Sequence, residues 1–390
     1  MAHILLGWEL GANRGHALTL VGISKALRAR GHQISFAMQR VDALTAEQRC
    51  GSPVWQTPIT PRLLISTSKP RTGAPATMGD ILGRLGLDDA DIVEALLRGW
   101  AQMLDAIQPD LVISDYGPFL LTAARQRCPT VSIGTGFGVP PSVMTSFPSL
   151  SGRPATHDED TLLGGVNVAL KRTGLSPLAS LPGIFAAERE LACSFAELDP
   201  YRSWRSEPLL APVLGGGFPE TASGGEEIFV YMPEQVQVDA PIWRGLAESK
   251  LPIRVYVSSV STGYREKLAS LGFFVEDKPL SFSGIAARSR LLLSHGGHGF
   301  VCSALLSGIP QVICHFDLEK VHYAKAVTGL SVGGMVSMTD IKPDPFARSL
   351  IDAYENEGLA GRALAAAPSF RNRCHRSMEE SLSDAVQQLL

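Results

Sequence analysis

The alternation of short apolar runs with helical stretches constrains the fold of this chain most strongly. An apolar run at 3–6 is followed by a glycine-rich loop at 7–16, a stretch with helical periodicity at 17–30, and a second apolar run at 34–38. A strand, a helix and a strand within about 35 residues form a βαβ unit, which implies parallel strands. The order recurs at 111–115, 119–127 and 131–133. The first half therefore predicts a parallel α/β domain.

The second half repeats this order. Strands are predicted at 228–231, 253–257, 273–275, 291–294 and 311–314, with helical stretches between them. The segment 207–227 holds three Pro and five Gly, which is typical of a linker. The sequence predicts an α/β protein with Rossmann-like domains at 1–206 and 228–371 and a last helix at 372–390. A length of 390 residues fits two domains.

Composition excludes several classes of protein. With 45% hydrophobic and 19% charged residues, the chain is neither disordered nor low in complexity. A net charge of −3 predicts no nucleic-acid partner, and no apolar run approaches the ~18 residues of a membrane span. The six cysteines form no CxxC pair, and the amino terminus does not resemble a signal peptide. We therefore expect a cytoplasmic protein.

The strongest local motif is Ser294-His295-Gly296-Gly297-His298-Gly299, between a predicted strand and a predicted helix at 300–307. Glycines at such a turn let a ligand approach the backbone, and the free N–H groups of a helix start attract an anion. We expect a diphosphate to bind here. The alternative is a tight turn that serves packing alone.

The first loop lacks GxGxxG and the P-loop pattern, but it ends in Gly15-His16 at the start of a helix. Asp115 ends a parallel strand of the same domain, and ligands of such sheets bind at the carboxyl ends of the strands. A histidine oriented by a carboxylate can act as a general base. The spacing alone leaves open a histidine that is satisfied by backbone at a helix start.

Apolar residues, histidines and cysteines suggest further expectations. The long segment 134–152 carries four apolar side chains that we expect to form an acceptor wall: Phe137, Pro140, Met144 and Phe147. Four histidines (His295, His298, His315, His322) cluster in the sequence, but without ligand spacing, so no metal site is expected. Cys302 and Cys314 are expected to be buried, inert thiols.

Several of these motifs resemble those of inverting GT-B glycosyltransferases of the macrolide, flavonoid and UDP-glucuronosyl transferase family. The motifs, in order along nearly the whole chain, are Gly15-His16 with Arg30-Gly31-His32, the segment 109–115, the 295–299 turn, Ala304-Leu305, and Gly308-Ile309-Pro310-Gln311. The resemblance implies two Rossmann-like domains facing across a cleft, with His16 as catalytic base and Asp115 as its partner. It also implies that the last helix packs back on the amino-terminal domain.

The same resemblance implies a donor site for a nucleoside-diphosphate sugar, UDP- or dTDP-linked, without cofactor or metal. This site would include Gly11, Gly15, His295, Gly296, Gly297 and Gly299. The chain departs from the family pattern at Phe300, Ser303, Glu319 and Lys320, where the family usually has Ser or Thr, Glu, Asp and Gln. The aromatic-x-Pro-Gln element that cradles the base is not evident in 276–280.

The sequence thus predicts a metal-independent, inverting glycosyltransferase that acts on a lipophilic small-molecule acceptor. The alternatives are a nucleotide-sugar epimerase on the same fold and a non-catalytic binding or partner protein. A peripheral membrane contact through the stretch 62–71, with Lys69, is a further possibility, although a solvated loop is the commoner outcome.

Overall fold

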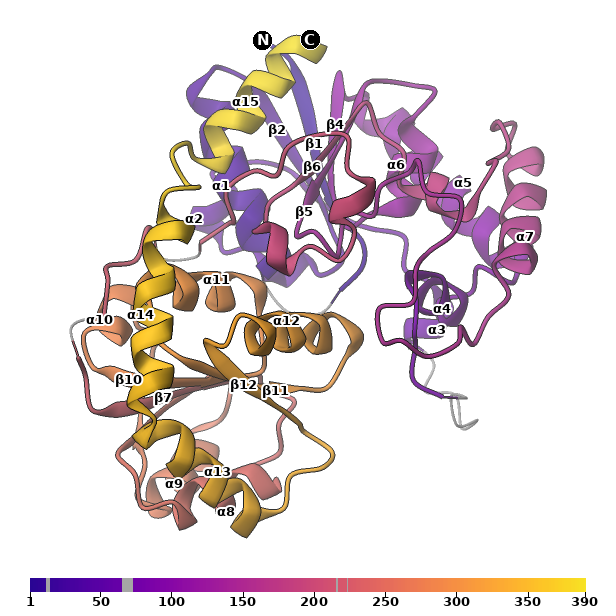
Figure 1. Cartoon of the computed structure of the whole chain (residues 1–390). Helices are drawn as coiled ribbons and strands as arrows, with labels where there is room; N and C mark the ends of the chain where they lie inside the picture. The colour runs from indigo at the N-terminus through magenta and orange to yellow at the C-terminus, as the bar shows by residue number, and fades with distance from the viewer. Residues whose placement is uncertain (12–14, 65–72, 215–216, 223) are drawn as a thin grey trace. The chain divides into compact units, whose positions relative to one another are not determined.

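The computed structural model describes residues 1–11, 15–64, 73–214, 217–222 and 224–390 (Figure 1). These residues form two compact units. One comprises Met1–Val213 together with Arg376–Leu390, and the other comprises Leu214–His375. The division after Val213 lies inside the segment 207–227 that was predicted as a linker.

The first unit contains one parallel sheet in the order β3-β2-β1-β4-β5-β6. Its strands are β1 His3–Trp8, β2 Gln33–Met38, β3 Val54–Gln56, β4 Leu111–Asp115, β5 Thr130–Gly134 and β6 Arg189–Ala192. The central strands β1, β4 and β5 are buried almost throughout, and the polar residues Ser114, Asp115, Thr130 and Ser132 are buried with them.

Eight α-helices are described in this unit: α1 Gly15–Ala29, α2 Ala46–Arg49, α3 Pro61–Leu64, α4 Met78–Arg84, α5 Ala90–Ile107, α6 Pro118–Ala124, α7 Glu159–Arg172 and α15 Met378–Leu389. Short 3-10 segments also occur: η1 Val41–Ala43, η2 Leu181–Phe185, η3 Ala196–Leu198 and η4 Arg202–Trp204. Helices α1 and α15 share one hydrophobic core with the sheet, and α6 contacts β4 and β5.

The last helix, α15, lies against α1 of the first unit (Figure 1). It begins at Met378 rather than at the predicted residue 372, because Ser377 and Glu380 form a reciprocal capping box that starts the helix there. Met378, Leu382 and Val386 bury their side chains in the core of the first unit.

The second unit has a parallel sheet in the order β12-β11-β10-β7-β8-β9. Its strands are β7 Glu227–Met232, β8 Ile253–Val257, β9 Phe274–Val275, β10 Ser289–Ser294, β11 Gln311–His315 and β12 Gly333–Ser337. Its helices are α8 Pro241–Glu248, α9 Thr262–Ser270, α10 Phe282–Ala286, α11 His298–Ser307, α12 Leu318–Gly329, α13 Pro343–Glu355 and α14 Glu357–Arg371.

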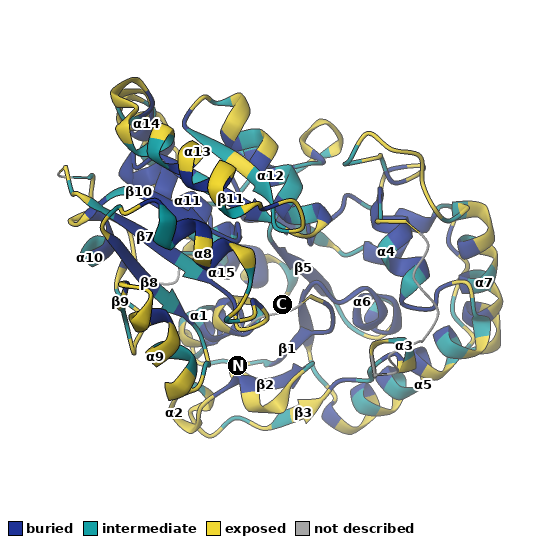
Figure 2. Ribbon diagram, turned by 90° about the horizontal axis from the view of Figure 1, so that it is seen from below, coloured by how far each residue is buried: buried dark blue, intermediate teal, exposed yellow. Residues whose placement is uncertain are grey.

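Helices cover both faces of this second sheet. One core joins the strands to α8, α9 and α13, and a separate core joins the opposite face to α10 and α11. Figure 2 shows the central strand β7 mostly dark and buried, and the helices α9 and α14 largely exposed. The predicted fold class, α/β with two Rossmann-like parallel sheets, is confirmed.

Both sheets have the same strand order when each is counted from its own first strand, namely 3-2-1-4-5-6. The chain reverses its direction of strand addition between the first and fourth strands, so a crevice opens at their carboxyl ends. This switch point lies between β1 and β4 in the first unit and between β7 and β10 in the second.

The predicted strands are all present, but β3, β6 and β12 were missed. β3 has three residues, β6 has the polar sequence Arg-Glu-Leu-Ala, and β12 begins with two glycines, so none carries an apolar strand pattern. No helix of the described part of the chain is long and apolar enough to cross a membrane. Most of the stretch 62–71 lies outside the described residues, although Arg62 itself pairs with Asp88 at 2.8 Å.

Candidate functional site

The switch point of the first unit brings His16 and Asp115 together. Trp8 and Asp115 are register partners at the carboxyl ends of β1 and β4, and α1 begins one residue before His16. His16 Nδ1 lies 2.9 Å from Asp115 Oδ1, with side-chain exposures of 20% and 3%. Because a carboxylate only accepts hydrogen bonds, Nδ1 is the donor, and Nε2 of the neutral ring is left as the basic atom.

Two aromatic residues that the sequence analysis missed hold this imidazole. The Trp8 ring stacks on His16 with centroids 5.5 Å apart, and Trp8 Nε1 donates to Leu10 O at 2.6 Å. The Tyr116 ring lies 6.1 Å from His16, and Tyr116 O accepts from Leu10 N at 3.1 Å. Tyr116 has a φ of +52°, an uncommon value for a residue other than glycine. In the sequence, only their positions pointed to this role: Trp8 lies inside the predicted loop 7–16, and Tyr116 directly follows Asp115.

Glu9 ties this loop to α6. Its carboxylate accepts from Phe119 N at 3.0 Å and Leu120 N at 2.8 Å, so it satisfies two of the free donors at the start of that helix. Burial raises the pKa of Glu9 to about 8, although the two backbone donors act in the opposite direction. The β1–α1 loop and the β4–α6 turn are thus joined on both sides of the histidine.

The two predicted glycines of this loop lie beside His16. Gly11 has a φ of +92°, and a Cβ built on it would be 2.5 Å from His16 Nε2. Gly15 is the first residue of α1, and a Cβ there would meet nothing within 4 Å. Residues 12–14, between them, lie outside the described part of the loop.

The predicted acceptor residues lie in the segment between β5 and α7, and all of them are buried. Phe137 is 5% exposed, Met144 2% and Phe147 4%. Phe137 packs edge-on against Tyr116 at 6.5 Å, and Phe147 packs edge-on against Phe185 at 6.2 Å. In this structure Phe137, Met144 and Phe147, with the buried Pro140, pack as core and offer little free surface.

A buried ion pair shapes the beginning of this segment. Arg205 pairs with Asp199, and their side chains are 6% and 0% exposed. Arg205 also donates to Val139 O and Gly136 O, each at 2.9 Å. The turn that carries Phe137 is therefore held by a residue from the end of the first unit, which the sequence analysis did not single out.

The predicted diphosphate turn lies at the switch point of the second unit, where Ser294 of β10 is the register partner of Tyr231 of β7. Gly296 has a φ of +88°, and Gly297 is the N-cap residue of α11. Helix α11 starts at His298, two residues before the prediction, so the N–H groups of its first turn include that of Gly299. The turn has the geometry expected of an anion site.

His295 is 5% exposed at this turn. Burial, together with the charge of Lys320, lowers the pKa of His295 to about 4. Its ring packs edge-on against Tyr231 at 5.2 Å and stacks on Phe316 at 6.3 Å. Within the described parts of the chain, its Nδ1 is buried without a hydrogen-bond partner. A neutral histidine with an unsatisfied polar atom is suited to a polar ligand.

The departures at 300 and 303 have structural consequences. Phe300 packs its ring against Tyr231 at 5.4 Å and Phe282 at 5.3 Å, so it belongs to an aromatic cluster. The Ser303 hydroxyl donates to Gly299 O at 2.8 Å, within its own helix. The Ser303 hydroxyl proton is therefore engaged in a hydrogen bond within α11.

Glu319 and Lys320 lie in the first turn of α12. Lys320 Nζ donates to Glu319 Oε2, and Tyr323 Oη donates to Glu319 Oε1 at 2.8 Å. Burial lowers the pKa of Lys320, but the charges of Glu319 and Asp317 outweigh it and raise that pKa above its usual value. The aliphatic part of Lys320 lies close to Gly296: a Cβ built on that glycine would be 3.5 Å from Lys320 Cβ. These residues therefore adjoin the diphosphate turn.

Two of the cysteines lie in the core of the second unit. Cys302 and Cys314 are buried, free thiols, and burial raises the pKa of both. Among the described residues, no group of three or more His, Cys, Asp or Glu side chains is arranged to hold a metal ion.

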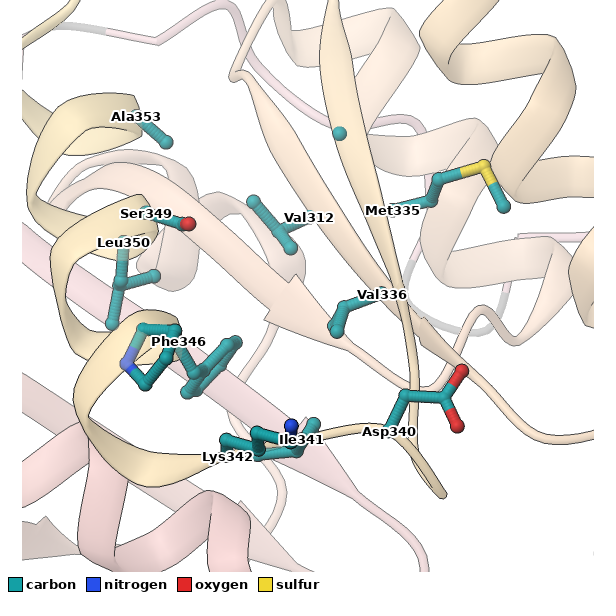
Figure 3. A pocket seen from close by; sticks show the side chains of 12 residues that line it. Val312, Met335, Val336, Asp340, Ile341, Lys342, Phe346, Ser349, Leu350 and Ala353 are labelled. Atoms are coloured by element: carbon teal, nitrogen blue, oxygen red, sulfur yellow. The ribbon is translucent and has the colours of Figure 1, made fainter.

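A separate cavity of about 300 Å³ lies in the second unit, between α13 and the strands β11 and β12. Figure 3 shows Phe346 and Leu350 of α13 and Val312 and Val336 of the strands around it. None of the predicted donor residues lines this cavity.

The chain matches no model of a known protein family, and no curated protein matches it. Solved structures do match over its full length. The calicheamicin glycosyltransferase CalG4 has a TM-score of 0.71 at 19% identity, with 100% of this chain and 98% of that chain covered. The glycosyltransferase VinC in complex with dTDP has a TM-score of 0.64 at 16% identity, with 99% and 98% covered. The spinosyn rhamnosyltransferase SpnG complexed with spinosyn aglycone has a TM-score of 0.62 at 16% identity, with 99% and 100% covered.

These likenesses establish the fold. The chain has the two-domain α/β GT-B fold of these enzymes, as its motifs predicted. At 16–19% identity, these likenesses show the fold alone.

Proposed function

We propose that this protein is an inverting glycosyltransferase that moves a sugar from a nucleoside diphosphate to a hydroxyl of a lipophilic small molecule. The observation that carries the proposal is the 2.9 Å contact between His16 Nδ1 and Asp115 Oδ1 at the switch point of the first unit. The pair lies at the carboxyl ends of the central strands β1 and β4 in a GT-B fold. A histidine paired with a carboxylate at this position supports a base-catalysed transfer, whereas a protein that only binds its ligand needs no such pair.

In the proposed reaction, His16 Nε2 takes the proton of the acceptor hydroxyl. The acceptor oxygen then forms a bond to the anomeric carbon while the bond from that carbon to the diphosphate oxygen breaks. Asp115 stabilises the imidazolium that forms, which lowers the energy of the transition state. Attack from the face opposite the leaving group inverts the anomeric configuration.

The second unit supplies the proposed donor site. The start of α11, with the N–H groups at Gly297 and Gly299, would stabilise charge on the leaving diphosphate without a metal ion. Neutral His295 would add an N–H donor, and Glu319, oriented by Lys320 and Tyr323, would accept from sugar hydroxyls. We propose a dTDP- or UDP-linked donor, in line with the dTDP bound to VinC.

The first test is binding. A ligand that binds only the native protein stabilises it, so dTDP or UDP at 100 times its Kd adds about 2.7 kcal/mol. A thermal-shift screen of nucleoside diphosphates and their sugars should show this increase in Tm. If none of them raises the Tm, the proposed donor site is wrong.

The second test is turnover with the donor that binds and a panel of lipophilic phenols and alcohols. His16→Ala should lower kcat by about 10²–10⁴-fold, while the exposed control His375→Ala should leave it unchanged. The anomeric coupling constant of the product tests inversion, and activity in excess EDTA tests metal independence. Equal activity of His16→Ala and wild type would exclude His16 as the base.

A further inference from the structure

Two glycines, Gly11 and Gly134, lie next to the two ends of the His16–Asp115 pair. A Cβ built on Gly11 would lie 2.5 Å from His16 Nε2, and also 3.2 Å from Cδ2 and 3.4 Å from Cε1 of that ring. A Cβ built on Gly134, the last residue of β5, would lie 2.8 Å from Asp115 Oδ1, the oxygen that binds His16 Nδ1. Both distances are shorter than real Cβ atoms keep from other heavy atoms.

Three contacts besides Gly11 restrain the imidazole, although its side chain remains 20% exposed. Trp8 stacks on it, Tyr116 lies 6.1 Å away, and Asp115 holds Nδ1. Trp8 is 1% exposed and is itself held by its bond to Leu10 O. Any atom added at position 11 must therefore displace His16 from Asp115 or displace the loop backbone.

The Asp115 carboxylate is similarly confined. Its side chain is 3% exposed in a central strand, and Gly134 belongs to the neighbouring strand β5. Gly134 O also accepts from Cys193 N at 2.7 Å, so its backbone is held by β6. Because β5 pairs with β4 on one side and with β6 on the other, a side chain at 134 would push the carboxylate away from the imidazole.

We infer that Gly11 and Gly134 are positioning residues: because neither carries a Cβ, His16 and Asp115 can form their hydrogen bond. The inference rests on the proposed function for its effect on catalysis, but the hydrogen bond itself is a property of the folded chain. Neither glycine contributes a side chain to the proposed reaction.

Both glycines have positive φ values, +92° for Gly11 and +151° for Gly134, so an alanine there also strains the backbone. Gly31 provides the matched control: its φ is +85° and a Cβ there would meet nothing within 4 Å. Gly31→Ala therefore has the strain without the contact. Gly11→Asn is a second control, because asparagine tolerates positive φ but still carries the Cβ.

The direct test is the NMR signal of the His16 Nδ1 proton, which a carboxylate partner shifts strongly downfield. The signal is assigned by its loss in His16→Asn. Gly11→Ala, Gly11→Asn and Gly134→Ala should shift or lose it, whereas Gly31→Ala should retain it with a comparable drop in Tm. This arm needs no substrate, so it tests the inference even if the protein transfers no sugar.

The catalytic test is a split between kcat and KM. A displacement of about 1 Å in a catalytic group can cost about 10²-fold in rate, so the variants at 11 and 134 should lose kcat by this order. Gly134→Ala, which lies outside the expected donor site, should keep the wild-type KM for donor. Gly31→Ala should keep wild-type kcat. The inference is overturned if Gly11→Ala and Gly134→Ala keep both the downfield signal and the kcat of Gly31→Ala.

Discussion

At the scale of single residues, the histidines at the two switch points have opposite environments. His16 is partly exposed and has a carboxylate at 2.9 Å, so a positive charge on its ring is compensated. His295 is buried, with no hydrogen-bond partner for Nδ1 in the described structure, and its pKa falls to about 4. The first is suited to accept a proton, and the second is suited to remain a neutral donor near pH 7.

Asp115→Asn tests the orienting role of the carboxylate. The amide keeps the shape of the side chain, but its NH₂ group can turn toward Nδ1 and favour the wrong tautomer of His16. We expect kcat to fall by about 10²–10⁴-fold while the circular dichroism spectrum is retained. The exposed Asp110→Asn is the control. Normal turnover by Asp115→Asn would show that the carboxylate is dispensable.

The pKa of His295 predicts a pH dependence of stability. Between pH 4 and about 6.5, the unfolded chain binds a proton at this residue and the folded chain does not. The free energy of unfolding therefore rises with pH across this window. The contribution of His295 is complete above about pH 6.5 and is lost as the pH falls toward 4, a change of about 3 kcal/mol.

The comparison of wild type with His295→Gln isolates this effect. Denaturant unfolding at several pH values between 4 and 7 should give a flatter dependence for the variant, because glutamine does not titrate. Parallel curves for the two proteins would show that the folded state does not depress the pKa of His295.

At the scale of elements, the segment between β5 and α7 shows that a loop can bury its apolar side chains as fully as a helix does. It has no helix or strand between Gly134 and Glu159, yet its aromatic side chains are buried. Its first turn is held by Arg205. The three guanidinium nitrogens of Arg205 donate hydrogen bonds to the Asp199 carboxylate, Val139 O and Gly136 O. Buried carbonyl groups that would otherwise lack partners are satisfied in this way.

Arg205→Met tests this arrangement. Breaking one partner of a buried ion pair leaves an uncompensated charge, so the variant should lose about 3–5 kcal/mol of stability. The pair of the exposed Arg244 with the half-buried Glu248 is the control, and Arg244→Met should cost at most about 0.5 kcal/mol. Chemical denaturation measures both. A loss of less than about 1 kcal/mol in Arg205→Met would contradict the proposed role.

At the scale of the whole molecule, each unit has its own hydrophobic core, and the chain returns to the first unit after completing the second. Residues Arg376–Leu390 belong to the first unit, although they follow the second in sequence. The stability of the first unit therefore depends on the last residues of the chain.

Leu382→Ala should destabilise the first unit alone. Leu382 is 1% exposed in that core, and a buried Leu→Ala change costs about 2–5 kcal/mol. Ile242, fully buried in the second unit, provides the matched variant Ile242→Ala. Calorimetry should show a different transition lowered in each case. An equal effect of both variants on every transition would contradict independent cores.

Particular residues show how far the sequence could be interpreted. The mainly apolar runs at 111–115 and 253–257 became strands with the predicted bounds, because a parallel strand that is covered on both faces is mostly apolar. The Gly-rich edge strand β12 has no such requirement and was missed. Trp8 and Tyr116 were also missed, since an aromatic residue beside a motif is equally typical of a core.

The sequence by itself determined the fold class and the two glycine-rich turns, because periodicity and backbone freedom are local properties of the chain. Only the tertiary structure decided which side chains meet. It placed His16 beside Asp115, buried the predicted acceptor wall, and set Gly11 and Gly134 against the ends of the pair. Such contacts join residues up to about a hundred positions apart, and their geometry depends on strand order and register, which no local pattern encodes.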